Sequence, residues 1–463
     1  MKLSTIATHL GVPYHGPDLA FSRLSIDSRT IEPGELFVAI SGDRFDGHDY
    51  VAQAAEKGAL ACVLEREVAT TIPCLIVNDS CQALGTIANL KRQDFTGKVA
   101  AITGSCGKTT VKGLLRGICE HAGSTVATRG NYNNHIGVPL TLMRLEDQQY
   151  AVIEAGTSGP NEIGYLTNLI EPDVAVVNNV NPAHLEGFSD LQAIAQEKAS
   201  IYEGLGPDSY AVVNLDDRFA PYFLTKNQKR KIIGFSAQSS KTPSVGLVHF
   251  VSARAAKIDT HGKLCFDLLI DGHAYPVCLG VVGKHNIANA LAAAACALGM
   301  GIAISSIQQG LLSYTGDKGR MQRLHRPDGG IVIDDTYNAN PASMKAAIDY
   351  ISRFPRPWLV CGDMAELGDY SSEGHSEIGA YAAEKGIERV YVIGHYAADV
   401  AAGFGEQAHQ FTDKRTLEAS LQQDINAQDV NADVALLIKG SRSAAMEDIV
   451  AVITKDKRGT QQC

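Results

Sequence analysis

The stretch "TGSCGKTT", residues 103–110, constrains the fold of this chain more than any other segment. A short, continuous, β-branched run at 99–103 leads into it and predicts a buried strand. The segment 109–123 follows with apolar residues at helical spacing, and Gly123 is suited to end that helix. A strand, a glycine-containing turn with Gly-Lys-Thr, and a helix together predict a nucleotide phosphate loop.

Each residue type in this loop suits phosphate binding. Glycines let backbone N–H groups point toward one spot, and the helix N-terminus adds about half a positive charge. Lys108 is placed to reach the outer phosphates and the Thr109 hydroxyl to bind Mg²⁺.

The spacing departs from strict G-x-x-x-x-G-K-[ST], because residue 102 is Ile and the first glycine is Gly104. The alternative is a Gly-rich turn with an incidental lysine, which the flanking strand and helix disfavour. Cys106 is interpreted as a tolerated small side chain. The residues expected to bind the nucleotide phosphates are Thr103, Gly104, Ser105, Cys106, Gly107, Lys108, Thr109 and Thr110.

Strands and helices alternate along most of the chain, which predicts an α/β fold with mostly parallel sheets. Length alone indicates two to four domains, because 463 residues exceed one ordinary core. We expect three: a small N-terminal α/β domain at 1–82, a central P-loop ATPase-type domain at 83–313, and a C-terminal Rossmann-like α/β domain at 314–463. Further strands are predicted at 150–156, 173–179, 210–217, 330–335, 357–363, 389–394 and 434–440.

Composition excludes several classes of protein. The formal net charge of −10 argues against a nucleic-acid binder, so an anionic ligand must be held by local cations and N–H groups. The ten cysteines form no C-x-x-C pair, which indicates neither a zinc ribbon nor a disulfide framework but small buried side chains in a reducing compartment. The N-terminus lacks a signal peptide's apolar stretch, and the longest apolar segment, 290–304, is shorter than the roughly 20 residues of a membrane span. We therefore expect a cytoplasmic protein.

Glu154 and His184, near strand ends of the central region, are candidates for metal binding, whereas the sequence pattern does not single out Lys198. Glu154 closes the strand at 150–156, where a carboxylate can hold Mg²⁺, although an ordinary strand-end acid is an equal alternative. His184 lies just past another strand end, and a structural role is the commoner one for a lone histidine. Lys198 is typical of a solvated lysine on an amphipathic helix.

Polar residues also gather at three later turns. Asn286 and Asn289 begin a helix, where they either cap it or hydrogen-bond a base. "DDTYNANP" at 334–341 crowds two Asp and two Asn at a strand end, which favours a site over a simple turn. Lys439 and Arg442 lie at a strand-to-helix turn suited to a carboxylate or phosphate.

These segments, in this order, resemble the Mur ligase family of ATP-dependent amide-forming enzymes over nearly the whole chain. The phosphate loop and the helix "HNIANALAAA" mark the family, whereas "DDTYNANPASM", "GDMAELG" and "KGSRSAAME" are typical of its members that add D-Ala-D-Ala. The D-N-P-R type motif of the lysine- or diaminopimelate-adding members is not found. The other segments that carry the resemblance are "DSRTIEPGELFVAISGDRFDGHDY", "GNYNNHIGVPLTLMRL" and "NPAHLEGF".

The resemblance implies the roles of the charged residues around ATP. Lys108 and the loop backbone bind the ATP phosphates, and Thr109 with Glu154 holds one Mg²⁺. His184 and Lys198 serve a second Mg²⁺, and Lys198 matches a lysine that family members modify to a carbamate. The residues expected to act in catalysis are Lys108, Glu154, His184, Lys198 and Arg320.

The resemblance also implies binding sites in all three domains. Asn286 and Asn289 match the adenine site, while Arg320, Asp335 and Asn338 reach the nucleotide from the third domain. The residues matching the region that binds a uridine diphosphate substrate are Asp27, Ser28, Arg29, Phe45, Gly47 and His48. Those matching a segment between the two substrates are Asn133 and Asn134. The candidates for the D-Ala-D-Ala carboxylate are Asn340, Lys439, Ser441 and Arg442.

One stretch departs from the family pattern. After Glu154 the chain reads "AGTSGPNEIGYL", where family members tend to have "GANHxGEI". Glu162 is retained, but Ser158 and Gly159 replace the Asn-His pair. The Asn-His pair that family members tend to have is therefore missing at these two positions.

The reaction implied by the resemblance joins the carboxylate of a UDP-muramoyl-tripeptide to the amine of D-Ala-D-Ala. ATP first phosphorylates the carboxylate, the amine attacks the acyl phosphate, and closure of the second and third domains excludes water. We expect a monomer. Folylpolyglutamate synthase is an alternative that the first-domain "DSR…GDRFDGHDY" disfavours. A P-loop kinase or regulatory NTPase is another, although a guanine-reading N-K-x-D is not found.

Overall fold

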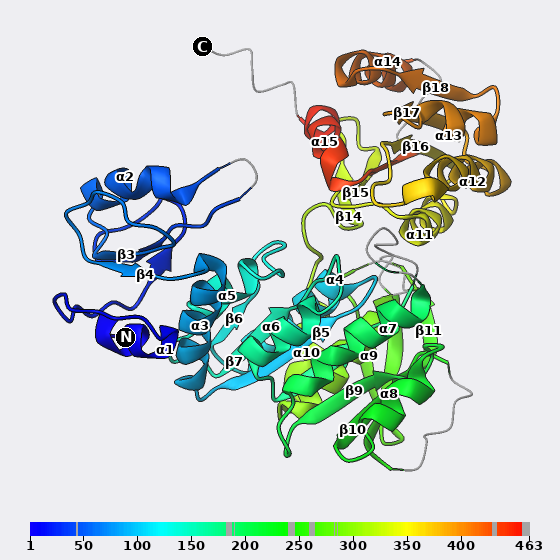
Figure 1. The fold of residues 1–463 in the computed structure, drawn as a ribbon. Coiled ribbons are helices and arrows are strands. Elements are labelled where there is room, and N and C mark those ends of the chain that lie inside the picture. Colours follow the sequence, from blue (N-terminus) through cyan, green and yellow to red (C-terminus); the bar gives the residue numbers. More distant parts are fainter. Residues whose placement is uncertain are drawn as a thin grey trace.

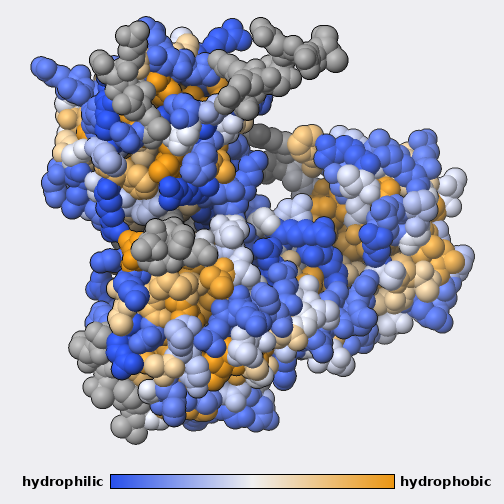
Figure 2. Space-filling model, turned by 180° about the vertical axis from the view of Figure 1, so that it is seen from behind, coloured by the Kyte–Doolittle hydropathy of each residue, from blue (hydrophilic) through white to orange (hydrophobic). Residues whose placement is uncertain are grey.

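The computed structural model describes residues 1–42, 45–181, 188, 190–238, 246–258, 264–281, 283–284, 286–427 and 433–455. They form the predicted mixed α/β structure, and it contains three sheets. In Figure 1 the N-terminal and C-terminal domains stand on either side above the central domain, which joins them. Figure 2 shows from behind that the two terminal domains are separated by a hollow. In both views each terminal domain adjoins the central domain, and the described parts of the two terminal domains stand apart from each other.

The N-terminal domain is built on a four-stranded parallel sheet with the order β1-β2-β3-β4. Helix α2 (Val51–Glu56) packs on one face, and α1 (Leu3–Leu10) with α3 (Ser80–Gln93) packs on the other. Because α3 also contacts the central domain, the predicted boundary at residue 82 falls inside a helix that serves both domains. The remaining elements are β1 (Leu24–Ser25), β2 (Leu36–Val38), η1 (Gly47–Tyr50), β3 (Ala61–Leu64) and β4 (Cys74–Ile76).

The central domain contains a nine-stranded sheet with the order β13-β12-β11-β10-β9-β8-β5-β7-β6. The strands from β6 to β11 pair in parallel, and β12 and β13 are antiparallel. The strands are β5 (Lys98–Thr103), β6 (Thr125–Ala127), β7 (Tyr150–Glu154), β8 (Val174–Val177), β9 (Tyr210–Asn214), β10 (Lys231–Ser236), β11 (Leu247–Ile258), β12 (Leu264–Ile270) and β13 (His273–Cys278).

Helices cover both faces of this sheet, which explains why its central strands are continuous apolar runs. Helix α4 (Lys108–Ala122), which follows the phosphate loop, packs with α9 (Asn286–Gly299) and α10 (Ile304–Ser313) on one face. The helices on the other face, beside α3, are α5 (Gly137–Leu142), α6 (Glu162–Ile170), α7 (Leu191–Ala199), η2 (Ser200–Gly204) and α8 (Ala220–Lys226).

One expectation about the cysteines is wrong. Cys265 and Cys278 are joined by a disulfide between β12 and β13. The antiparallel register places these two residues directly opposite each other, although 13 positions separate them in the sequence. The sequence pattern did not reveal the pair, because a hairpin's register depends on its turn as well as on spacing. The other cysteines in the described part of the chain are free thiols.

The C-terminal domain has a six-stranded sheet with the order β14-β15-β19-β16-β17-β18, in which only β14 runs antiparallel to its neighbour. Its strands are β14 (Gln322–His325), β15 (Ile331–Asp335), β16 (Arg356–Cys361), β17 (Arg389–Ile393), β18 (Ala408–Phe411) and β19 (Val434–Lys439). Its helices are α11 (Pro341–Ile351), η3 (Gly368–Tyr370), α12 (Ser371–Glu384), α13 (Ala397–Phe404), α14 (Lys414–Asn426), η4 (Arg442–Ala444) and α15 (Glu447–Thr454).

This sheet, too, is covered on both faces, by α11 to α13 on one and by α14 and α15 on the other. The Rossmann-like arrangement places the ends of β15 and β19 side by side. Within the described ranges, no helix is both long enough and apolar enough to cross a membrane.

Candidate active site

The phosphate loop lies between β5 and α4, where the sequence predicts it. Gly107 is the N-cap of α4 and has a φ of 78°, a left-handed conformation that favours glycine. A Cβ at Gly107 would also lie 2.5 Å from Oδ1 of Asn289, so the loop and α9 are too close for a larger residue. Glycine at this position therefore serves both the turn and the packing of α9.

Asparagines that follow β8 hold the loop in place. The backbone N–H of Cys106 donates to Oδ1 of Asn179 at 2.8 Å, and Nδ2 of Asn178 donates to the Cys106 carbonyl at 2.9 Å. The Ser105 hydroxyl donates to the carbonyl of Asn181 at 2.9 Å. Sequence reasoning missed these asparagines, although their position at the carboxyl end of a predicted strand was a usable signal.

Lys108 folds back onto the loop, and its Nζ donates to the Gly104 carbonyl at 2.8 Å. Burial lowers the pKa of Lys108, and the nearby Glu154 carboxylate opposes that shift. The lysine is thus held at the loop, close to the buried acid of the neighbouring strand.

Glu154, at the end of β7, faces the start of α4 and is almost completely buried. Its Oε1 accepts from Nδ2 of Asn133 at 2.8 Å and from the Thr109 hydroxyl at 3.3 Å. Its Oε2 lies 3.2 Å from Nζ of Lys112, and Lys112 also donates to the Gly130 carbonyl. Burial by itself would raise the pKa of Glu154, but Lys112 and Lys108 lower it, so the carboxylate is charged.

The donors at this point fit a hard divalent cation. Oε2 of Glu154 is buried and, apart from its ion pair with Lys112, accepts no hydrogen bond from the described residues, and the Thr109 hydroxyl lies beside the same carboxylate. Carboxylate and hydroxyl oxygens with nucleotide phosphates are the ligands that Mg²⁺ uses in nucleotide sites. No group of three or more His, Cys, Asp or Glu side chains suited to a metal is found among the described residues. A cation here would therefore depend on the nucleotide as well as on the protein.

Lys198 lies on α7 and is 1% exposed, so its interpretation as a solvated lysine is wrong. Burial, followed by the charge of Lys108, lowers the pKa of Lys198 to about 7. The adjacent Glu197 anchors this segment, because its carboxylate accepts from the backbone N–H groups of Asn161 and Ile163. His184, the other expected ligand of a second cation, lies outside the described residues.

The third domain reaches the loop through Arg320. Its Nη2 donates to the Thr109 hydroxyl at 2.8 Å, and its guanidinium lies 3.9 Å from the centroid of the Tyr337 ring. Nε of Arg320 is buried and donates no hydrogen bond to the described residues. The arginine therefore links the second and third domains through the Thr109 hydroxyl.

Two of the other expected third-domain residues pair with each other. Nζ of Lys439 is 2.6 Å from Oδ2 of Asp335 and donates to the Asn338 carbonyl at 2.8 Å. Because the Lys439 side chain is 2% exposed, it is held in the wall of the site. Arg442, by contrast, is largely exposed and pairs with Glu447.

Asn340 is the N-cap of α11, and with Ser343 it forms a capping box. Its Nδ2 also donates to Sγ of Cys106 at 3.7 Å, which is a second contact between the C-terminal domain and the loop. Ser441 is buried, and its hydroxyl contacts that of Ser443 at 3.1 Å.

The expected adenine residues, Asn286 and Asn289, are buried at the start of α9. Nδ2 of Asn289 donates to Oδ1 of Asn286 at 2.8 Å, and Oδ1 of Asn289 accepts from Nδ2 of Asn178 at 3.0 Å. In this structure they therefore brace α9 against the loop. Asn134 is held at the start of α5, where its Oδ1 accepts from the backbone N–H of Gly137 at 2.8 Å.

The expected uridine-site residues belong to the N-terminal domain, and no hydrogen bond or ion pair among the described residues joins them to the phosphate loop. Arg29 and Phe45 are exposed, and Arg29 pairs with Asp27 at 2.8 Å.

His48 is buried, where its Nε2 accepts from the Glu65 N–H and its Nδ1 donates to Asp46. The Ser28 hydroxyl donates to Gln53. A Cβ on Gly47 would lie 2.7 Å from the Ile40 nitrogen, so this turn requires glycine.

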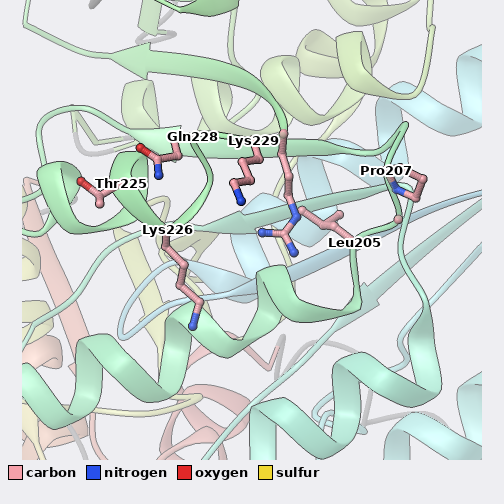
Figure 3. A pocket seen from close by; sticks show the side chains of 8 residues that line it. Leu205, Pro207, Thr225, Lys226, Gln228 and Lys229 are labelled. Atoms are coloured by element: carbon pink, nitrogen blue, oxygen red, sulfur yellow. The ribbon is translucent and has the colours of Figure 1, made fainter.

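An open pocket of about 450 Å³ lies elsewhere on the central domain (Figure 3). Its lining residues precede β9 and β10 and include Lys226, Lys229 and Arg230, so the pocket lies at the N-terminal ends of these strands, whereas the phosphate loop follows the C-terminal end of the parallel strand β5. None of them is a predicted site residue. The pocket is therefore separate from the loop, the buried carboxylate and Arg320.

A phosphate loop that faces a buried carboxylate, with an arginine supplied by a second domain, defines a multidomain P-loop enzyme that uses a nucleoside triphosphate. Residues 20–92, 102–297 and 319–456 match the family models "Mur ligase family, catalytic domain", "Mur ligase middle domain" and "Mur ligase, glutamate ligase domain". The chain belongs to the Mur ligase family. It is an ATP-dependent ligase, and the predicted family, fold class and enzyme class are confirmed.

Relatives of the same length share both sequence and fold. A UDP-N-acetylmuramoyl-tripeptide–D-alanyl-D-alanine ligase of Escherichia coli is 38% identical over 460 residues, which cover 98% of this chain and 99% of the relative. A crystal structure of MurF from Acinetobacter baumannii has a TM-score of 0.89 and 31% identity, covering 98% of both chains. A MurF ligase from Thermotoga maritima in complex with ADP has a TM-score of 0.79 and 27% identity, covering 93% of this chain and 97% of that one.

Proposed function

We propose that this enzyme joins D-alanyl-D-alanine to UDP-N-acetylmuramoyl-tripeptide at the expense of ATP, in the synthesis of peptidoglycan precursors. The observation that carries the proposal is the 38% identity to a ligase of that name along 98% of the chain. The site adds chemical support, because an amide ligase needs groups that bring anions together and little acid–base machinery.

The two half-reactions explain the residue types. An oxygen of the peptide carboxylate attacks the γ-phosphorus of ATP, ADP leaves, and an acyl phosphate forms. The deprotonated amine of D-Ala-D-Ala then attacks the acyl carbon, and phosphate leaves from the tetrahedral intermediate. Lys108 and Arg320 would offset the repulsion between the carboxylate and the triphosphate, and would stabilise charge on the transferred phosphoryl group.

Mg²⁺ would neutralise phosphate charge when bound, and the oxygens of Thr109 and Glu154 would hold it. A carbamate on Lys198, with His184, would hold a second cation. The burial of Lys198 and its lowered pKa support this role, because the neutral amine is the form that reacts with carbon dioxide. The ion pair with the Lys112 ammonium keeps the Glu154 carboxylate ionised and holds its orientation.

The remaining predictions follow from this assignment. Exposed Arg29 and Phe45 are candidates for contact with the UDP moiety, within an N-terminal domain at about 1–82. The central domain would extend to about 313, and the C-terminal domain would bring D-Ala-D-Ala to the site. We propose that the enzyme acts in the cytoplasm, where ATP and the nucleotide-linked precursor are available. We also propose that it acts as a monomer.

Phosphate release by the purified protein tests the proposal. Release from ATP should require UDP-N-acetylmuramoyl-tripeptide and D-Ala-D-Ala together, and the pentapeptide product should appear in equal amount. Omission of each substrate in turn is the control. Equal release with neither substrate, or release with a simple hydroxyl acceptor, would refute a ligase of this specificity and favour an NTPase or kinase.

A further inference from the structure

Two free cysteines of the N-terminal domain lie side by side, far from the ATP site. Cys62 on β3 and Cys74 on β4 are direct partners in the parallel register. Their Sγ atoms are 3.0 Å apart, in a hydrogen-bond contact between thiols. Adjacent strands are about 4.8 Å apart, and disulfides form across Cα separations of roughly 4.4–6.8 Å. The backbone therefore already has the spacing that a disulfide needs.

The two thiols differ in exposure. Cys62 is fully buried in the small core under α2, against residues such as Phe37 and Ala39. Cys74 is half-buried and lines an open hollow of about 530 Å³ together with Tyr14, His15 and Pro73. A small reagent from solution can thus reach Cys74, while Cys62 is reached through Cys74.

Their acidities differ in the same sense. The hydrogen bond between the thiols lowers the pKa of Cys74 and raises that of Cys62, because it stabilises the Cys74 thiolate. Cys81, a half-buried thiol seven positions further on, has the opposite environment from Cys74. Burial and the acids Asp79 and Glu65 raise the pKa of Cys81.

We propose that Cys74 and Cys62 form a thiol–disulfide site that reacts with hydroperoxides, with Cys74 as the attacking thiol and Cys62 as the resolving one. An accessible thiolate beside a second thiol is the arrangement found in peroxide-sensitive cysteine pairs. The site is independent of the ligase reaction, since neither cysteine contributes to the nucleotide site.

The reaction balances without any other component. The Cys74 thiolate attacks one peroxide oxygen, the O–O bond breaks, and hydroxide leaves to take up a proton as water. Sγ of Cys62 then attacks Sγ of the Cys74 sulfenic acid, an S–S bond forms, and the S–O bond breaks. The released hydroxide takes the Cys62 proton. Together the two thiols lose two electrons to form the disulfide, and hydrogen peroxide accepts them and is reduced to two molecules of water.

Peptide mapping of the full-length protein provides the test. The protein is treated with a small excess of hydrogen peroxide, alkylated under denaturing conditions and digested with trypsin without reductant. Cleavage at Arg66 separates Cys62 in peptide 58–66 from Cys74 in peptide 67–91. We expect these two peptides to become linked, with the loss of two hydrogens, and to separate again with dithiothreitol.

Peptide 67–91 also contains Cys81, which supplies a matched control. The link should persist in Cys81→Ser and disappear in Cys74→Ser. In Cys62→Ser, which lacks the resolving thiol, dimedone should label Cys74 several-fold more than in the unchanged protein. Thermal unfolding of each variant checks that it is folded. Absence of the linked peptides in the folded, unchanged protein, or their persistence in Cys74→Ser, would overturn the proposal.

Discussion

At the scale of single residues, the site is defined by charged side chains that are almost completely buried. Glu154 and Lys112 form an ion pair with side chains 2% and 6% exposed, and Lys198 is 1% exposed. Isolated charges are costly to bury, so each must be paired or neutralised. Lys112 was not predicted, although it lies three residues after Thr109 on α4 and hence on the same helix face.

The state of Lys198 should depend on pH. Because its pKa is lowered to about 7, the neutral amine that attacks carbon dioxide becomes the major form as the pH rises above 7. We expect a ¹³C carbamate signal from ¹³C-bicarbonate to increase between about pH 6 and 8, in line with the neutral fraction. The Lys198→Ala variant is the control. A signal of equal size in that variant would assign the carbamate to another lysine.

Activity should depend on the same side chain. Lys198→Ala should reduce kcat by about 10²-fold or more. The variant lacks the carbamate that would hold the second cation, and that cation would stabilise negative charge in the transition state. Short carboxylic acids should restore part of the rate by occupying the space of the carbamate. The measurement is phosphate release with both substrates present. Full activity without added acid would refute the carbamate role.

The ion pair Glu154–Lys112 should be strongly coupled. Glu154→Gln should lower the free energy of unfolding by about 3–5 kcal/mol, because it leaves the buried Lys112 ammonium without a charged partner. The double variant with Lys112→Met should lose less than the sum of the single losses in urea titrations. Glu120→Gln, in the exposed pair with Arg116 on the same helix, should change stability by less than about 1 kcal/mol. Additive effects at Glu154 and Lys112 would contradict the coupling.

At the scale of elements, the position of the loop depends on how closely helices pack against α4. Gly310 on α10 lies directly over the backbone of α4, where a Cβ would be 2.3 Å from the Cα of Ile118. The predicted helix at 109–123 was nearly correct, since α4 covers Lys108–Ala122. Its close contact with α10 was not predictable, because helical periodicity indicates which face is buried but not which helix covers it.

Gly310→Ala should therefore push α10 away from α4 and destabilise the protein by about 1–3 kcal/mol. Gly164→Ala on α6 is the matched control, because its Cβ would meet only the Ser200 side chain at 3.8 Å. This control should be neutral or stabilising by about 0.5–1 kcal/mol, as alanine favours helix over glycine. Thermal and urea unfolding measure both variants, and equal stability of the two would contradict the packing argument.

In the molecule as a whole, the candidate nucleotide site is formed by two domains. Arg320 of the C-terminal domain hydrogen-bonds Thr109 of the loop, and Asn340 contacts Cys106. The terminal domains stand apart in Figure 1 and across the hollow in Figure 2. A reaction through an acyl phosphate needs water excluded, so we expect the domains to close on the substrates.

Small-angle X-ray scattering should detect this closure. A non-hydrolysable ATP analogue with UDP-N-acetylmuramoyl-tripeptide should decrease the radius of gyration of the unchanged enzyme. Arg320→Ala should reduce this compaction, because it removes the donor that links the third domain to the loop. Arg320→Lys keeps the positive charge but lacks the planar guanidinium with its several N–H donors, so its decrease in the radius of gyration should be intermediate. Full compaction of Arg320→Ala would show that other contacts drive closure.

Features that depend on short stretches of chain could be predicted from the sequence alone. The phosphate loop, the strand that precedes it and the helix that follows it are encoded by glycines, β-branched residues and helical spacing within about twenty residues. The same holds for the α/β alternation and for the motifs that indicated the Mur ligase family.

Which distant groups meet could not be predicted from the sequence, because it depends on how the elements pack together. Arg320 reaches Thr109 across 211 positions, Lys439 pairs with Asp335 across 104, and Cys62 lies against Cys74 through strand register. Lys198 changes from an apparently solvated lysine to a buried one because α7 turns it inward. The physical reason is that burial and pairing depend on how elements pack, and periodicity within one element does not specify its partner.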